Sequence, residues 1–161
     1  MTNWLAPEIA ARITAAADNY SPSNPQQLKQ LHTALCRAEP REVYFGIMAV
    51  FLTPRFGPQE VAGRLLIGIK PRPREPLEEI IRNVLGTWDL SVEQLPWYLA
   101  EKFGGSEVLN TLAALEGEGT RTEKELVAIG TFRFWLPKFR SDAQPCGQPD
   151  LAHKAAQGRL P

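Results

Sequence analysis

The residues best suited to binding an anionic partner lie in one short proline-rich stretch. Residues 70–74 read Lys-Pro-Arg-Pro-Arg, Arg64 lies upstream, and no acidic residue lies between Arg64 and this stretch. Because proline favours extended backbone at and before its own position, the stretch presents successive positive charges. It could bind a phosphate, RNA or an acidic protein. The alternative is a solvated loop between helices, partly neutralised by Glu75, Glu78 and Glu79.

A second basic stretch is interleaved with aromatic residues. Residues 132–140 read Phe-Arg-Phe-Trp-Leu-Pro-Lys-Phe-Arg, a composition that can stack bases or form a protein-binding hot spot. The alternative is a last helix whose aromatic residues close the core and whose cations favour the negative end of the helix dipole. The two stretches give these candidate partner-binding residues: Arg64, Lys70, Arg72, Arg74, Arg133, Trp135, Lys138 and Arg140.

Residues for catalysis or metal binding are not grouped in the sequence. His32 and His153 are the two histidines, whereas zinc and iron sites need clustered ligands. Residues 117–120, Gly-Glu-Gly-Thr, lack the Gly-Lys-Ser/Thr ending of a phosphate loop, so they predict a turn. The sequence also lacks a nucleophile elbow and the kinase motifs. We therefore expect no metal, no cofactor and no enzymatic activity; an enzyme with a cryptic helical site is the least favoured hypothesis.

The composition is that of a globular protein with balanced charge. The 161 residues include 18 basic and 18 acidic residues, giving a net charge of zero, and 43% are hydrophobic. Because no global field attracts nucleic acid or a membrane, either partner would require a local patch. No apolar run reaches the roughly 18 residues of a membrane-spanning helix and the start lacks a signal-peptide pattern, so we expect a cytoplasmic protein without a membrane partner. Cys36 is predicted to be buried and Cys146 exposed.

These residues are positioned by a series of predicted amphipathic helices. Helix-start chemistry recurs along the chain, as at Glu39-Pro40, Ser91 and Thr122, and the intervening runs repeat apolar residues at spacings of three and four. Ser91 and Gln94 predict a capping box, and Pro96 predicts either a kink in that helix or a later start at Pro96. The eight predicted helices cover about residues 4–18, 25–36, 40–52, 58–69, 77–88, 91–103, 106–115 and 122–135. Residues 40–52 are apolar on nearly all sides, which predicts a central, buried helix.

The domain boundary is predicted near residue 140. Residues 1–140 form one all-helical domain in this interpretation, and residues 141–161 form a tail with three prolines, two glycines and no helical periodicity. Pairing the helices gives hairpins that begin near residues 4, 40, 76 and 106, a period of about 30–36 residues.

This layout resembles the HEAT-like class of α-hairpin repeats over about residues 4 to 136. The resemblance, which is one of period and pattern, implies an all-α, solenoid-like stack of antiparallel hairpins that binds another macromolecule. A compact, irregular helical bundle is the alternative fold. The leading hypothesis for function is a non-catalytic protein–protein interaction module, and the second is a nucleic-acid-associated module that uses the basic patches.

Overall fold

The computed structural model describes residues 3–19 and 25–138. Within these residues the chain forms eight α-helices and a 3-10 helix without any strand, so the predicted all-α fold is confirmed. Arg140, Cys146, His153 and the predicted tail lie outside the described residues. The helices are α1 (Ala6–Asn19), α2 (Gln26–Leu35), α3 (Pro40–Phe51), α4 (Phe56–Ile69), α5 (Leu77–Val84), α6 (Gln94–Phe103), α7 (Gly105–Gly117) and α8 (Glu123–Trp135), followed by η1 (Leu136–Lys138).

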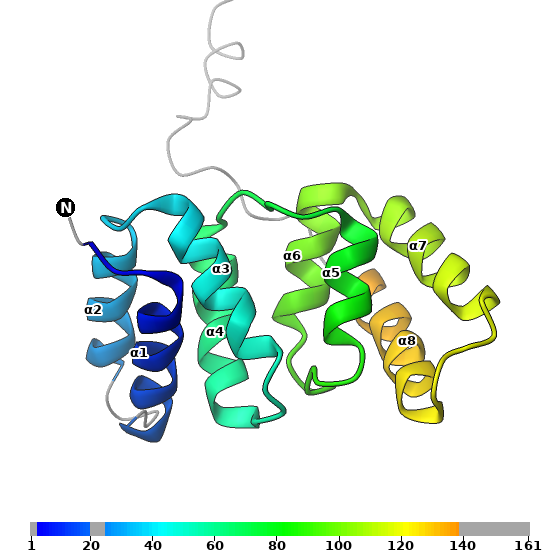
Figure 1. The fold of residues 1–161 in the computed structure, drawn as a ribbon, viewed down its shortest axis with the longest axis horizontal. Coiled ribbons are helices and arrows are strands. Elements are labelled where there is room, and N and C mark those ends of the chain that lie inside the picture. Colours follow the sequence, from blue (N-terminus) through cyan, green and yellow to red (C-terminus); the bar gives the residue numbers. More distant parts are fainter. Residues whose placement is uncertain (1–2, 20–24, 139–161) are drawn as a thin grey trace, which may run out of the picture.

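Successive helices form antiparallel pairs that follow one another along the long axis of the molecule (Figure 1). The pair α1/α2 lies at one end, α3/α4 and α5/α6 lie in the middle, and α7/α8 lies at the other end. The helices α1 and α3 pack together, as do α5 and α7, while α4 packs against α2 and α6. The helix α6 also packs against α8, so the second helices of the pairs form a continuous row.

Local capping explains where several helices begin. The Glu39 side chain accepts a hydrogen bond from the Glu42 amide (2.9 Å) at the start of α3, and Pro40 occupies the first turn, where its missing N–H needs no partner. Thr122 and Glu125 form a reciprocal capping box at the start of α8. Both helix starts therefore agree with the sequence prediction.

The capping box predicted for Ser91 and Gln94 is wrong. The amide and hydroxyl of Ser91 both donate to the carboxylate of Asp89, and α6 begins only at Gln94. The Val92 carbonyl accepts from the Trp88 indole (3.0 Å), and it could not accept a helical bond from residue 96, because Pro96 lacks an N–H. The helix α5 ends at Val84 and does not continue to Trp88, because residues 85–87 form a turn in which the Thr87 amide donates to the Val84 carbonyl.

The core confirms most of the predicted apolar stripes. The helix α3 is buried as predicted, and α3 and α4 each contribute seven buried residues, more than α1, α2 or α8. The predicted burial of Cys36 is wrong, because Cys36 is exposed. Five large apolar residues of the predicted stripes are exposed as well: Leu5, Leu52, Leu109, Leu126 and Val127. Cys36 follows the buried Leu35 at the end of α2, where the chain turns away, and α8 buries Ala128, Ile129 and Phe132 instead.

Candidate functional site

The first helices of the four pairs form a second row, α1, α3, α5 and α7, and this row is interrupted between α3 and α5. The helix α3 packs closely against α1 and α4, and α5 packs closely against α7. However, α3 and α5 do not pack closely against each other. The interruption leaves a groove with a volume of about 380 Å³, which we call the α3–α5 groove. Its apolar lining consists of Ala6, Pro7, Phe45, Met48, Ala49, Leu52, Ile80 and Val84, and its polar lining consists of Glu75 and Asn83.

Polar contacts bridge α3 to the segments before and after α5. Before α5, the Tyr44 hydroxyl donates to the Glu75 carboxylate (3.0 Å). After α5, the Thr87 hydroxyl donates to the Phe51 carbonyl (2.7 Å). Burial, and then the Glu75 carboxylate, raise the pKa of Tyr44, so this phenol stays a neutral donor. The groove therefore lies between two fixed polar contacts.

The contact beyond α5 is reinforced by Gln59 of α4. Its side-chain NH₂ donates to the carbonyls of Thr53 and Thr87 (2.8 Å each), and its side-chain oxygen accepts from the Asp89 amide (2.7 Å). Gln59 is completely buried, and these bonds join the α3–α4 loop to the α5–α6 loop. Because a buried amide needs such partners, the two loops are held in one arrangement.

The basic stretch after α4 is fixed in place against α6. The Tyr98 hydroxyl donates to the Pro71 carbonyl (2.7 Å), and the Lys102 ammonium donates to the Lys70 carbonyl (2.9 Å). Burial, followed by the nearby Glu101 carboxylate, raises the pKa of Tyr98. The stretch is therefore held by side chains of α6, which present its cations in a defined position.

The four candidate cations in and before this stretch are not equivalent. Arg64 forms an ion pair with Glu60 (3.0 Å), and Lys70 forms one with Glu101 (2.8 Å). Arg72 and Arg74 are exposed, and no ion pair joins either of them to another residue in the described part of the chain. These two arginines are therefore the cations of this stretch best placed to bind an external anion.

Arg72 and Arg74 line a hollow of about 680 Å³ together with Lys102 and Phe103. Glu75 lines both this basic hollow and the α3–α5 groove, so the two depressions are adjacent. Of the three acids that could neutralise the stretch, Glu78 pairs with Arg82 (2.7 Å), whereas Glu75 accepts from the neutral Tyr44 hydroxyl and lines the hollow itself. Apolar and cationic surfaces thus meet at Glu75.

The second basic stretch contributes to the packing of α6 and α8. The Trp135 indole donates to the Leu90 carbonyl (2.9 Å), and the Trp97 indole donates to the Trp135 carbonyl (3.2 Å). Arg133 forms an ion pair with Glu116 of α7 (2.6 Å), and this contact raises the pKa of Arg133. Lys138 lies in η1, and Arg140 is outside the described residues.

The structure therefore does not bring all the predicted residues into one site. Tyr98 of α6 holds the first stretch, whereas its neighbour Trp97 contacts the second. Adjacent helical residues point about 100° apart, so the stretches lie on different sides of α6. Sequence reasoning missed the groove residues Phe45 and Leu52, because nothing local distinguishes them from their buried neighbours on α3.

Comparisons of this chain with known protein families, with curated proteins and with solved structures found no match. The described residues contain no cluster of three or more potential metal ligands. In the same part of the chain, no helix combines the length and apolar character needed to cross a membrane. The groove and the arginines beside it are therefore the features of the molecule that indicate a function.

Proposed function

We propose that this chain is a non-catalytic module that binds a segment of another protein in the α3–α5 groove. The segment would place apolar side chains in the groove and acidic side chains against Arg72 and Arg74. The observation that supports this proposal most directly is the shared border at Glu75, where an apolar groove adjoins a hollow with exposed cations. A HEAT-like stack of hairpins acting in the cytoplasm is part of the same proposal.

The dimensions and chemistry of the groove favour a peptide segment as its occupant. Helix-in-groove recognition uses apolar anchors on one face of a helix, and apolar side chains line most of the α3–α5 groove. Leu52 is 50% exposed at the groove. Arg41 lies 5.8 Å from the Phe45 ring and adds a third cation beside the apolar lining. This combination matches an amphipathic segment with carboxylates near one end.

The test uses a fluorescein-labelled amphipathic peptide with leucines on one face and glutamates at one end. A second peptide has lysines in place of the glutamates, and a single-stranded oligouridylate represents the nucleic-acid alternative. Fluorescence anisotropy should show tighter binding of the acidic peptide than of the basic peptide or the RNA. Tighter binding of the RNA would favour the nucleic-acid module instead.

Two variants locate the binding surface. Leu52→Glu places a charge at the groove and should abolish binding of the acidic peptide. Arg74→Glu creates repulsion at the acidic end and should raise the Kd about tenfold, which corresponds to ~1.4 kcal/mol. Both positions are exposed, so the free energy of unfolding should change by no more than about 0.5 kcal/mol.

Matched controls separate the groove from general surface effects. Leu126→Glu changes a similarly exposed leucine on α8, and Arg37→Glu changes an exposed arginine just after α2. Neither control should alter peptide binding. Equal losses in Leu52→Glu and Leu126→Glu, or an unchanged preference for the acidic peptide in Arg74→Glu, would contradict the proposed site.

A further inference from the structure

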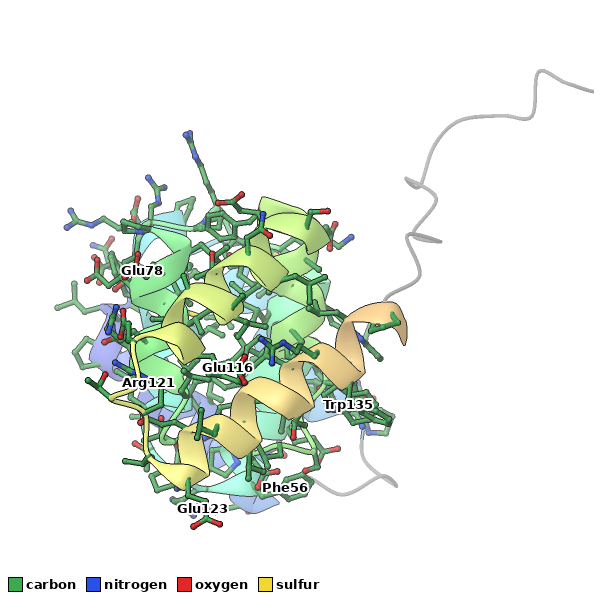
Figure 2. All side chains as sticks on the ribbon, turned by 90° about the vertical axis from the view of Figure 1, so that its right-hand side faces the viewer. Phe56, Glu78, Glu116, Arg121, Glu123 and Trp135 are labelled. Carbon is green, nitrogen blue, oxygen red and sulfur yellow. The ribbon has the colours of Figure 1, made fainter. Side chains whose placement is uncertain are left out.

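The outer face of α8 is apolar although it points away from the core. Ala128, Ile129 and Phe132 are buried on the inner side of this helix. At about 100° per residue, Val127, Gly130 and Phe134 lie on the opposite side. Val127 is 53% exposed, and Phe134 is 56% exposed while its ring meets the Trp135 ring edge-on. Figure 2 faces this end of the molecule, where α8 runs across the view from Glu123 to Trp135.

Gly130 has no evident role within the chain. It occupies the middle of α8 and is exposed, and a Cβ added there would meet no atom of the protein within 4 Å. Glycine inside a helix is unfavourable relative to alanine, so its presence on an exposed face is not explained by the fold. A missing side chain does allow another backbone to approach this face closely.

An apolar hollow lies beside the same face. It has a volume of about 380 Å³ and is bounded by Val127 of α8 and by Leu85, Trp88 and Leu90 of the segment after α5. Glu123 and Lys124 also line it. The face therefore carries both a projecting aromatic side chain, Phe134, and an apolar hollow beside Val127, about two helical turns apart.

We propose that this face binds the same face of a second copy of the chain. In an antiparallel α8–α8 pair with its two-fold axis between Gly130 and Thr131, Phe134 of each copy lies opposite Val127 of the other. Each Phe134 ring then enters the hollow beside Val127, and Gly130 at the crossing allows the helices to approach. Both copies use the same surface in this arrangement, so two copies saturate the contact. The result is a dimer and not a fibre.

The charges on α8 favour a second copy of the chain as the partner of this face. An antiparallel pair brings the first turn of one α8, which carries Glu123 and Glu125, near the last turn of the other, which carries Arg133. Antiparallel helices also place opposite dipole ends together. Since the chain has a net charge of zero, two copies do not repel each other. Because one helix of each copy forms most of the proposed contact, we expect a dimer that forms reversibly with increasing concentration.

The test measures the mass of the full chain by sedimentation velocity over a wide range of concentration. We expect a monomer at low concentration and a dimer at high concentration. Gly130→Leu should prevent close approach and abolish the dimer, while its thermal stability at low concentration stays equal or rises because leucine favours the helix. Phe134→Ser should also abolish the dimer by removing the side chain that enters the hollow.

Phe56→Ser is the matched control, because Phe56 is 51% exposed at the start of α4 and lies outside the proposed contact. This variant should dimerise like the unmodified chain. A chain that remains monomeric at every concentration would overturn the proposal. A dimer that persists in both Gly130→Leu and Phe134→Ser would also overturn it, because association would then use another surface.

Discussion

At the scale of single residues, Gln59 determines how one end of the α3–α5 groove is built. Its amide reaches two loops that are separated by α4 and α5, and each of its bonds has good geometry. The side chain is fully buried, so water cannot easily replace it as a partner for these backbone groups. One polar side chain thus links the chain segments on both sides of the groove.

Replacing Gln59 with leucine should therefore destabilise the protein. Gln59→Leu keeps a similar volume but leaves the carbonyls of Thr53 and Thr87 and the Asp89 amide without this partner. The free energy of unfolding should fall by about 1–3 kcal/mol, measured by urea denaturation.

Gln30→Leu, at an exposed position of α2, is the control for this substitution and should change the free energy of unfolding by no more than about 0.5 kcal/mol. If Gln59→Leu is as stable as the unmodified chain, the buried amide does not stabilise the two loops.

At the scale of elements, the sequence predicted the helix starts and ends to within two residues, except for the start of α6 and the end of α5. Glu39-Pro40 and Thr122 are local signals, and both were confirmed. The end of α5 lies in a turn over residues 85–87, which the periodicity of the apolar residues does not reveal. Likewise, α8 is apolar on two sides, so the pattern alone could not show that Val127 faces outward.

The candidate site was also predicted only in part from the sequence. The basic stretch was visible in the sequence because its charges are adjacent, and the exposed pair Arg72 and Arg74 was among the predicted residues. The α3–α5 groove was not predicted, because it exists only where two helices far apart in sequence fail to pack. Contacts such as Tyr44–Glu75, which connect residues 31 positions apart, are equally invisible to local patterns.

The crossing of α1 and α3 yields a prediction at this scale. A Cβ added at Gly46 would lie 2.6 Å from the Cβ and Cγ2 atoms of Ile9, and 3.0 Å from the Ala6 carbonyl oxygen. Gly46→Ala should therefore push α1 away from α3 and lower the free energy of unfolding by about 1–3 kcal/mol, despite the better helix propensity of alanine.

Because Ala6 lines the groove, this variant should also weaken binding of the acidic peptide. Gly57→Ala is the matched control, since its added Cβ would meet only the Ala17 Cβ at 3.9 Å, an ordinary contact. Chemical denaturation and anisotropy test both effects. Equal stability of the two variants would mean that α1 does not require close approach at Gly46.

At the scale of the whole molecule, the groove separates two groups of helices. The helices α1 to α4 form one group and α5 to α8 the other, and close packing between the groups is provided by α4 and α6. Polar contacts of Gln59 and Tyr44 also connect the two groups. Cooperative unfolding of the chain should therefore depend strongly on the α4–α6 contact.

Gly63 lies at this contact and tests the idea. An added Cβ would be 2.9 Å from Val92 Cγ1 and 3.1 Å from the Gln94 Cβ, so Gly63→Ala should loosen α4 from the start of α6. In the unmodified chain, urea unfolding followed by tryptophan fluorescence and by far-ultraviolet circular dichroism should give coincident transitions.

In Gly63→Ala the two transitions should separate. Trp88, Trp97 and Trp135 lie in the second group and Trp4 alone in the first, so fluorescence follows mainly the second group while dichroism follows both. Gly57→Ala, in the same helix but without a close neighbour, should keep the transitions coincident. If Gly63→Ala lowers stability while the transitions stay together, the two groups unfold as one unit, because contacts other than α4–α6 are then sufficient to couple them.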